Sequence, residues 1–569
     1  MQNGNRRNYK EWSKEELVRE ILALKKQKTY GLVWEHEKTK EVFDYFINWE
    51  GEKTKEEFSP ESKDKFPVLA EVKDKEILTD KEKPVNLLIE GDNYHSLAVL
   101  NFTHKNAVDV IYIDPPYNTG NNDFKYNDKF VDKEDGYRHS KWLSFMSKRL
   151  SLAKNLLKET GVIFISIDDN EQASLKLLCD DIFGEQNFIA NYIWESRSGK
   201  GATAKNVVNL HEYVLCYAKD IGKSIFTKDV RTKTGGSYED EQGKYSREQL
   251  KQWGQGDKRE DRPTMFYPVT APDGTKVLPI KDDGTEGRWR ISQKSMQELI
   301  KNGDVDFVID NNKYGVYRKI REGKITKTAM GSLIFGVGTS SNGTIELKQL
   351  FKDKVFDTTK PTGLIKYVLN LVETSKNPVI LDFFAGSGTT GHAVLALNKE
   401  DRGNRSFILC TNNENNICTD ICYPRVQKVI KGYTTPSKEK IEGLGSNLKY
   451  FKTDFVEASQ TDKNKRKLVD KCTEMLCIKE NAFENVKDRK KFKIFKNNQQ
   501  YLGIIFDDEY IEEFIEEAKK IDGKINVYVF SYDESVPTKE FKSIKNKVTL
   551  CPIPETILKV YRKVFKNDN

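Results

Sequence analysis

The sequence predicts an α/β protein with a mostly parallel central sheet that is interrupted by an inserted domain. Between residues 85 and 220, short apolar runs alternate with amphipathic segments, a pattern typical of parallel strands connected by helices. The same alternation resumes after residue 340. The stretch between these two regions is rich in Gly, Lys, Arg and Asp and contains several turn signals. This break in the pattern indicates a separate domain.

These changes of pattern divide the 569 residues into five segments. Residues 1–84 read as a charged N-terminal helical arm followed by a Lys/Glu-rich linker that adds little to the core. Residues 85–220 and 341–433 are the two halves of the α/β core, and residues 221–340 are the insert. Residues 434–569 form a C-terminal domain, in which YLGIIF, EYIEEFIEEAKK and INVYVFS predict strand, helix and strand.

Within the core, apolar runs of strand length predict strands and longer amphipathic segments predict helices. In the first half we expect a strand ending at Ile113, a helix over 142–157, a strand ending at Ile167, a helix over 171–183 and a strand ending at Ala218. In the second half we expect a helix through LIKYVLNLVE, a strand ending at Asp382, a glycine-rich turn, a helix from Thr389 and the strand SFILC.

Composition excludes several classes of protein. No apolar stretch approaches the roughly 18 residues of a membrane span, and the N-terminus lacks the apolar core of a signal peptide, so we expect a cytoplasmic protein with no membrane partner. The eight cysteines have loose spacings that favour reduced thiols and no metal site. A net charge of +7 permits nucleic-acid binding without demonstrating it.

The first candidate site follows the strand VDVIYI, which runs directly into Asp114-Pro115-Pro116-Tyr117. Ligands of open α/β sheets bind at the carboxyl ends of strands. The two prolines stiffen the main chain, so that Asp114 and the Pro115 carbonyl can accept hydrogen bonds from both hydrogens of an aromatic amine. Tyr117 offers a flat face on which a flipped-out base can stack. The tetrapeptide is therefore predicted to be catalytic.

The second candidate site is the glycine-rich turn that follows the strand PVILD. Phe384, Gly386, Gly388 and Thr389 form a strand-turn-helix junction, where backbone can approach a ligand and free N–H groups can bind an anionic group. The turn also fits the pattern G-x-G-x-x-G. Glu414 could bind ribose hydroxyls, with Asp382 as the alternative carboxylate on the cofactor side, and the turn alone is compatible with both S-adenosylmethionine and a nicotinamide dinucleotide.

The pairing of the two turns favours methyl transfer over other reactions. Both turns end strands of one sheet, so we expect them at the same edge, with a methyl donor facing a gripped amine. A dehydrogenase would need a substrate clamp that the sequence does not show. A 5-methylcytosine enzyme would need a Pro-Cys pair, and a motor would need the phosphate loop G-x-x-x-x-G-K-[ST], and the sequence contains neither.

At this point the chain resembles the β-class amino-methyltransferases and, more specifically, the modification subunits of type III restriction-modification systems. The matching segments lie between Gly31 and Leu409 and include DPPYNTG, GVIFISIDDNE, IFGEQNFIA, HEYVLCYAK, YPVTAPDGT, GRWRIS and VFDTTKPTGLI. The resemblance implies a Rossmann-like methyltransferase core with a mixed, mostly parallel seven-stranded sheet. It also implies a circularly permuted motif order, with a target-recognition domain between the tetrapeptide and the glycine-rich turn.

The resemblance further implies an S-adenosylmethionine-dependent enzyme that methylates the N6 amine of adenine in double-stranded DNA. It assigns cofactor-binding positions to Asn118, Thr119, Gly120, Lys360, Pro361 and Asp92. It implies a homodimer, with a possible contribution from the C-terminal domain, and a separate helicase-nuclease restriction subunit. Two alternatives remain open: a solitary adenine methyltransferase, and an inactive DNA-specificity protein on the same fold.

For DNA contact, the insert offers Arg288-Trp289-Arg290, which combines a ring with two bidentate donors. Lys258, Arg259 and Arg262 could neutralise phosphates. The alternative for this group is a solvated charged face with Trp289 in a small core.

Overall fold

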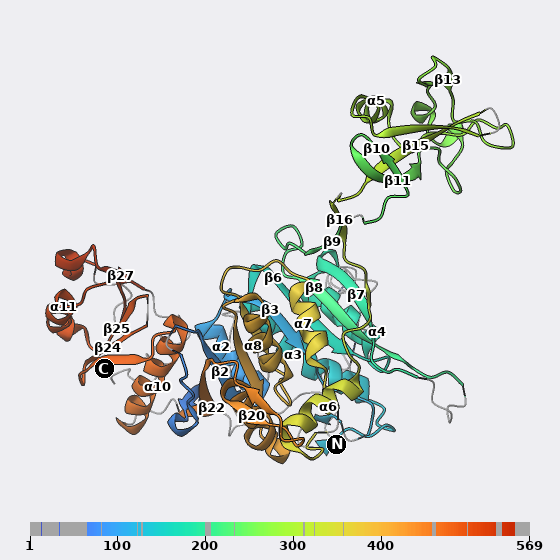
Figure 1. The fold of residues 1–569 in the computed structure, drawn as a ribbon. Coiled ribbons are helices and arrows are strands. Elements are labelled where there is room, and N and C mark those ends of the chain that lie inside the picture. Colours follow the sequence, from blue (N-terminus) through green and yellow to red (C-terminus); the bar gives the residue numbers. More distant parts are fainter. Residues whose placement is uncertain are drawn as a thin grey trace. The chain divides into compact units, whose positions relative to one another are not determined.

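The computed structural model describes residues 65–551, with short gaps at 81, 122, 127–128, 200–205, 233, 311–312, 324, 357, 458–461, 498 and 531–537, together with Ser13 and Trp34. The expected N-terminal helical arm therefore lies outside the described residues almost entirely. The chain divides into two compact units, of which the smaller is Thr227–Met330 and the larger contains the residues on both sides of it (Figure 1).

The larger unit is organised by a ten-stranded sheet within the described residues. Its strands, in spatial order, are β1 (Lys65–Glu71), β22 (Asn447–Glu457), β2 (Val85–Glu90), β19 (Ser406–Thr411), β18 (Val379–Asp382), β3 (Val108–Ile113), β6 (Leu157–Ile167), β8 (His211–Ala218), β7 (Phe188–Glu195) and β17 (Leu333–Ile334). The strands from β22 to β6 run parallel, whereas β1, β8 and β7 introduce antiparallel pairs. The mixed, mostly parallel sheet is as predicted.

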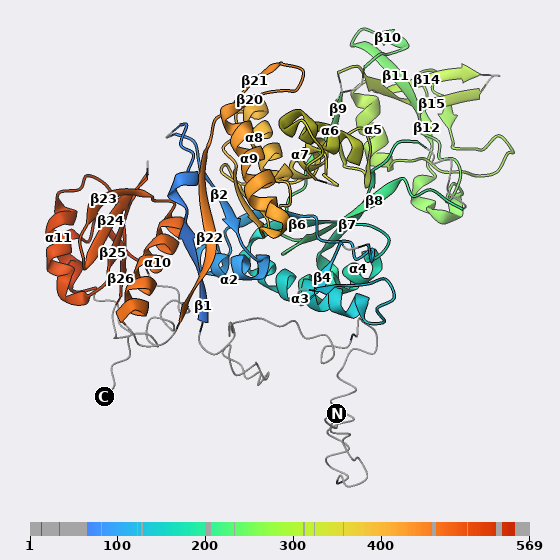
Figure 2. The same ribbon diagram turned by 90° about the horizontal axis from the view of Figure 1, so that it is seen from below.

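Helices cover both faces of this sheet, as Figure 2 shows. One face carries α2 (Asn93–Thr103), α3 (Arg138–Leu156) and α4 (Gln172–Phe183), and the other carries α6 (Ser340–Phe351), α7 (Thr362–Asn370), α8 (Thr389–Asp401) and α9 (Tyr423–Lys431). Burial on both faces explains why the central strands are apolar throughout: all six residues of β3 are buried.

The sheet is wider than the predicted seven strands because three peripheral strands extend it. We expected residues 65–84 to be a linker, but β1 pairs with β22, and Val68 and Leu69 are fully buried. We also placed β22 in the C-terminal domain, but it pairs with β2 in the central sheet. Sequence alternation could not show these partners, because β1 and β22 are almost 400 residues apart.

The predicted core elements are present, with small shifts at their ends. The strands end at Ile113, Ile167, Ala218 and Asp382 as expected, and α8 begins at Thr389. One prediction was incomplete, since β7 between α4 and β8 was not recognised. Only two of its eight residues, Tyr192 and Trp194, are buried, so this strand is less enclosed than the central strands. Among the described residues, no helix is both long and apolar enough to cross a membrane.

The smaller unit contains a four-stranded antiparallel sheet in the order β10 (Tyr238–Asp240), β11 (Gly243–Gln249), β15 (Lys313–Arg321) and β14 (Val305–Asp310). Short strand pairs, β12 (Val269–Thr270) with β13 (Lys276–Val277) and β9 (Lys228–Thr232) with β16 (Ile325–Ala329), and helix α5 (Gln293–Lys301) complete it. This unit, Thr227–Met330, contains fewer residues than the predicted insert at 221–340. One reason is that β17 pairs with β7 and so belongs to the central sheet.

The C-terminal part of the larger unit holds helix α10 (Asp462–Glu480) and a five-stranded sheet. Its strands are β23 (Glu484–Asp488), β24 (Phe492–Lys496), β25 (Tyr501–Ile505), β26 (Ile525–Val529) and β27 (Val548–Leu550). Helix α11 (Ile511–Lys519) connects β25 to its parallel neighbour β26, so the predicted strand-helix-strand is present.

Candidate active site

A cavity of about 720 Å³ lies at the carboxyl ends of β3 and β19 in the larger unit. It brings together segments from four places in the sequence: the turn after β3, the segment leading into β4 (Lys125–Tyr126), the segment before α7, and the segment after β19. The lining residues are Asp114, Pro115, Pro116, Tyr117, Thr119, Asn121, Asp123, Lys354, Val355, Phe356, Thr358, Lys360, Glu414, Asn415, Ile417 and Ile421.

The side chain of Tyr117 is anchored between two carboxylates. Its hydroxyl lies 2.9 Å from Asp114 Oδ1 and 2.9 Å from Glu212 Oε2, and it donates its single proton to one of them at a time. Burial and the two nearby carboxylates raise the pKa of Tyr117 well above its ordinary value, so the phenol remains protonated. The ring is therefore fixed by its hydroxyl while it lines the cavity.

Lys360 neutralises this pair of carboxylates. Its ammonium lies 2.9 Å from both oxygens of Asp114 and 3.3 Å from Glu212 Oε2, and the side chain is only 5% exposed. Burial by itself would lower the pKa of Lys360, but the attraction of Asp114 and Glu212 outweighs it and the pKa is raised. Lys360 therefore stays charged, 4.9 Å from the centre of the Tyr117 ring.

The backbone of the tetrapeptide is held from behind by α3 and the residue that precedes α4. Trp142 Nε1 donates to the Pro116 carbonyl at 2.7 Å. The next residue after Tyr117, Asn118, is fully buried with φ of 58°, and its amide donates to Glu171 Oε1 at 2.5 Å. This hydrogen bond stabilises the left-handed backbone conformation of Asn118 directly after Tyr117. The conformation of Asn118 in turn sets the direction in which the chain leaves the turn.

The glycine-rich turn is organised around an inward-facing carboxylate. Asp382, only 3% exposed, accepts from the Phe384 N–H at 3.0 Å and from the Thr390 hydroxyl at 2.5 Å. Burial raises the pKa of Asp382 to about 7 although both hydrogen bonds oppose the shift. The Asp382 carboxylate therefore stabilises the turn through these two hydrogen bonds, and it does not line the cavity.

Two glycines allow this turn to close onto α8. Gly386 and Gly388 have φ of 50° and 78°, a region that other residues rarely adopt, and Gly388 caps the start of α8. Phe356, which lines the cavity, lies 3.6 Å from the place where a Cβ on Gly386 would be. The turn therefore borders the cavity through Phe356, while Gly388 at the start of α8 packs against Cys422.

The buried Arg425 of α9 supports the turn from the other side. Its Nη1 donates to the hydroxyls of Ser387 at 3.0 Å and Thr389 at 2.7 Å. Burial lowers the pKa of Arg425 to about 10, which leaves it charged at neutral pH. We predicted that Thr389 binds the cofactor. Thr389 is only 7% exposed, and its hydroxyl accepts a hydrogen bond from Arg425 inside the protein.

The structure separates the remaining predicted residues into two groups. Thr119, Lys360 and Glu414 line the cavity together with the tetrapeptide, and the Glu414 carboxylate pairs with Lys125. Of the two carboxylates predicted on the cofactor side, Glu414 lines the cavity and Asp382 does not.

The second group does not line it. Asp92 caps α2 by accepting from the Tyr94 N–H at 2.8 Å and pairs with Arg149. Gly120, with φ of 78°, packs against Lys133, and Pro361 caps α7. These residues shape the surroundings of the cavity.

Two contributors to the site were missed at the level of sequence. Glu212 is an acidic residue at the start of the otherwise apolar strand HEYVLCYA, an anomaly that could have marked it. Phe356 belongs to VFDTTKPTGLI, and only its position over Gly386 reveals its role.

For the insert, the structure decides between the two interpretations of Trp289. This side chain is 2% exposed, and its Nε1 donates to the Tyr267 carbonyl at 2.8 Å. Trp289 therefore belongs to a small hydrophobic core and cannot stack on a base. Arg288 turns back to the Gly256 carbonyl, whereas Arg290 is exposed.

Comparison with known proteins identifies the class to which this fold and site belong. The family model described as DNA methylase matches residues 108–513, which is more than half of the chain. The chain therefore belongs to the DNA methylase family. This match confirms the family resemblance that DPPYNTG and the segments around it predicted.

Particular relatives narrow the comparison. The Mod subunit of the type III restriction-modification enzyme StyLTI from Salmonella typhimurium is 38% identical over 365 residues, covering 59% of this chain and 53% of the relative. The type II methyltransferase M.KpnI from Klebsiella pneumoniae is 35% identical over 391 residues, covering 64% of this chain and 90% of the relative. The chain thus spans about half the length of the first relative and most of the second.

Among solved structures, PvuII DNA methyltransferase (cytosine-N4-specific) matches 61% of this chain and 92% of its own, at 11% identity and a TM-score of 0.32. The α/β fold of this chain is defined by the strand order of its own central sheet.

Proposed function

We propose that this protein is an S-adenosylmethionine-dependent DNA methyltransferase that modifies the exocyclic N6 amine of a flipped-out adenine. The observation that carries the proposal is the shared cavity of about 720 Å³, which is lined by the Asp114–Tyr117 turn and by Glu414 and bordered by the glycine-rich turn. Membership of the DNA methylase family and the relatives named as methyltransferases support it.

The residues around the glycine-rich turn fit the cofactor. α8 begins directly after the turn that borders the cavity, and its N-terminus suits the carboxylate of the cofactor's amino-acid end. Glu414, which lines the cavity, suits its ribose hydroxyls. When bound, S-adenosylmethionine supplies an activated methyl group on a sulfonium. Lys360, which also lines the cavity, keeps its charge next to Asp114 and Glu212.

The tetrapeptide acts on the amine of the base. Asp114 Oδ1 already receives hydrogen bonds from Lys360 and Tyr117, whereas Oδ2 receives one from Lys360, so a lone pair on Oδ2 remains for an amine hydrogen. The Pro115 carbonyl accepts from the other hydrogen. Two acceptors draw electron density back onto the nitrogen, and Tyr117 supports the base by stacking.

Removing Asp114 tests this function. In Asp114→Ala, transfer of tritiated methyl groups from S-adenosylmethionine to DNA should fall by a factor of about 10² to 10³, because the amine loses its charged acceptor. Cofactor affinity, measured by titration calorimetry, should change less than about threefold. Glu134→Ala removes an exposed carboxylate from the same connection between β3 and α3 and should leave the rate unchanged.

An Asp114→Ala protein that folds and methylates DNA at the wild-type rate would contradict the proposal. If this variant fails to fold, Asp114→Asn keeps the shape of the side chain and replaces it in the same assay.

The biological setting forms part of the same proposal. Similarity to the StyLTI Mod subunit supports a modification subunit of a type III restriction-modification enzyme. A separate helicase-nuclease polypeptide, a homodimer and double-stranded DNA as substrate are what the family resemblance adds to the proposal. Coverage of 90% of M.KpnI favours the second candidate, a methyltransferase that acts without such a partner. Affinity purification of the tagged chain from its own host separates the two: a co-eluting helicase-nuclease supports the first, and fully active protein that elutes without one supports the second.

A further inference from the structure

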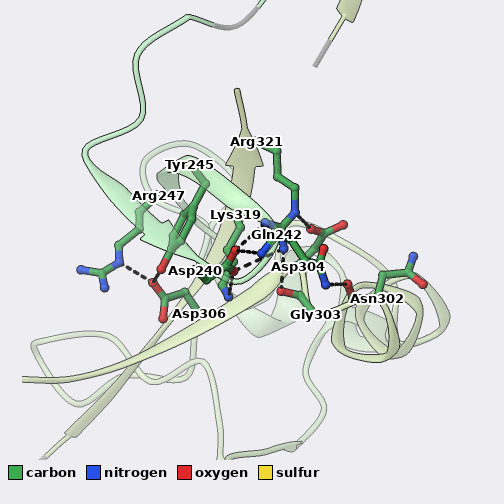
Figure 3. Close-up of polar contacts among 10 residues, drawn as sticks. All are labelled: Asp240, Gln242, Tyr245, Arg247, Asn302, Gly303, Asp304, Asp306, Lys319 and Arg321. Atoms are coloured by element: carbon green, nitrogen blue, oxygen red, sulfur yellow. Dashed lines mark hydrogen bonds and ion pairs between the residues drawn. The ribbon is translucent and has the colours of Figure 1, made fainter. Parts of the chain in front are cut away.

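The antiparallel sheet of the smaller unit presents two arginines in contrasting environments. Arg247 on β11 and Arg321 on β15 lie on paired strands, where Arg247 is opposite Lys319 and Arg321 is opposite Tyr245. Figure 3 shows both side chains within one cluster of polar contacts. Their hydrogen bonds differ, and this difference indicates different roles.

All three guanidinium nitrogens of Arg321 donate hydrogen bonds within the smaller unit. Its Nε donates to Asp304 Oδ1 at 2.8 Å, its Nη1 donates to Asp240 Oδ1 at 2.8 Å, and its Nη2 lies 3.4 Å from Asp240 Oδ2. The Gly303 carbonyl accepts from Nη2 as well, at 3.3 Å. Every nitrogen of this guanidinium has a partner, so Arg321 holds β10, β14 and β15 together.

Arg247 is held in place but keeps its outer edge available. Its Nε donates to Asp306 Oδ2 at 2.6 Å, and the Tyr245 hydroxyl fixes the same oxygen at 2.8 Å. The guanidinium carbon lies 3.6 Å from the centre of the half-exposed Tyr238 ring. The acceptors near the guanidinium are Asp306 and the hydroxyls of Tyr238 and Tyr245, and the two terminal nitrogens point away from the cluster in Figure 3.

The charges of the cluster cancel. Arg247, Lys319 and Arg321 carry three positive charges, and their partners Asp240, Asp304 and Asp306 carry three negative charges. A neutral cluster attracts a phosphate weakly, because phosphate binding depends mainly on net positive charge. What distinguishes Arg247 is its hydrogen-bond geometry. Its guanidinium presents a planar pair of donors, whose orientation is fixed by stacking on Tyr238 and by the hydrogen bond to Asp306.

We propose that Arg247 reads a guanine in the recognition sequence, with its two terminal nitrogens donating to O6 and N7 in the major groove. This inference rests on the proposed function, since it requires that the protein acts on DNA. O6 and N7 of guanine form the acceptor pair that matches a planar arginine edge. Fixing the guanidinium before binding lowers the entropy lost on contact and sharpens the discrimination against other bases.

Arg247→Lys tests the proposal, because lysine keeps the charge and loses the planar pair of donors. The full-length protein and the variant select duplexes from a randomised pool by binding, at two salt concentrations, and the retained duplexes are sequenced. One guanine position enriched by the wild type should lose about 10- to 100-fold of its preference in the variant. Arg489→Lys, an exposed arginine outside this unit, controls for the exchange itself and should leave the profile unchanged.

Two outcomes overturn the proposal: an unchanged sequence profile, or a uniform loss of binding to all sequences with a weaker salt dependence, which marks a phosphate contact. Thermal unfolding establishes that the variant is folded, and if it is not, Arg247→Gln is used in its place. Failure of the proposed function is distinguishable, because it appears as wild-type protein that transfers no methyl group to DNA, whereas the selection reads binding alone.

Discussion

Asp114 directly follows β3 and Asp382 ends the adjacent parallel strand β18, yet the two carboxylates have different roles. The Asp114 side chain is 27% exposed, lines the cavity and pairs with Lys360. Asp382 is 3% exposed and turns inward to the Thr390 hydroxyl and the Phe384 N–H. The same residue type at the same sheet edge is therefore catalytic in our proposal in one case and structural in the other.

The surroundings of the two residues explain the difference. A positive charge next to Asp114 compensates its charge at the cavity wall, whereas Asp382 has only neutral donors in a buried position. The pKa of Asp382 therefore rises to about 7. In this protein the carboxylate that lines the cavity has a charged partner, whereas the carboxylate that shapes the turn has neutral donors.

The largest effect that tests this comparison is expected from Lys360→Met. Lys360 is 5% exposed and contacts both Asp114 and Glu212, so its removal leaves two carboxylates close to the same tyrosine hydroxyl. We expect a loss of about 3 to 5 kcal/mol in the free energy of unfolding, measured with urea. The double variant Lys360→Met with Glu212→Gln should recover part of this loss, because only one charge is then unpaired. A loss below about 1 kcal/mol would show that the charges are not coupled.

A smaller effect, with a distinctive pH dependence, is expected from Asp382→Asn. The folded protein holds the proton of Asp382 up to a pKa of about 7, against an ordinary value of 3.8. Stability from this protonation is complete below pH 4 and is lost as pH rises through 7, at about 1.4 kcal/mol per pKa unit. Asparagine has no such titration and can still accept from Phe384 and donate to Thr390.

The variant should therefore gain stability relative to the wild type by a few kcal/mol between pH 5 and pH 8. Urea unfolding across this range measures the difference. Curves that stay parallel would mean that Asp382 is ionised throughout.

Much of this architecture follows from local sequence. The apolar run of β3 and the pattern strand-glycine-helix around Gly386 give both turns, and the parallel sheet then places them at one edge. Local patterns could not predict that β22 lies between β1 and β2, because that pairing depends on tertiary contacts between distant segments.

The limits are the same within the site. The sequence identified Asp382 and Glu414 as alternatives, but which carboxylate faces the cavity depends on the path of the turn and on the side chains packed behind it. Likewise, Lys360 was assigned to the cofactor through the family resemblance, and its pairing with Asp114 and Glu212 appears only when β3, β8 and the segment before α7 are brought together. Long-range electrostatic partners leave no periodic signal in a single sequence.

The smallest effect is expected from Thr390→Val, which tests whether neutral donors alone tune Asp382. Valine has nearly the shape of threonine and removes only the hydroxyl that donates to Asp382 Oδ2. We expect a loss of about 1 kcal/mol in the free energy of unfolding, and a further rise in the pKa of Asp382 because its charged form loses a donor. The loss should be greater at pH 8 than at pH 5, since the hydroxyl stabilises the carboxylate more than the acid. In an Asp382→Asn background this pH dependence should vanish, and its persistence there would assign the effect to another group.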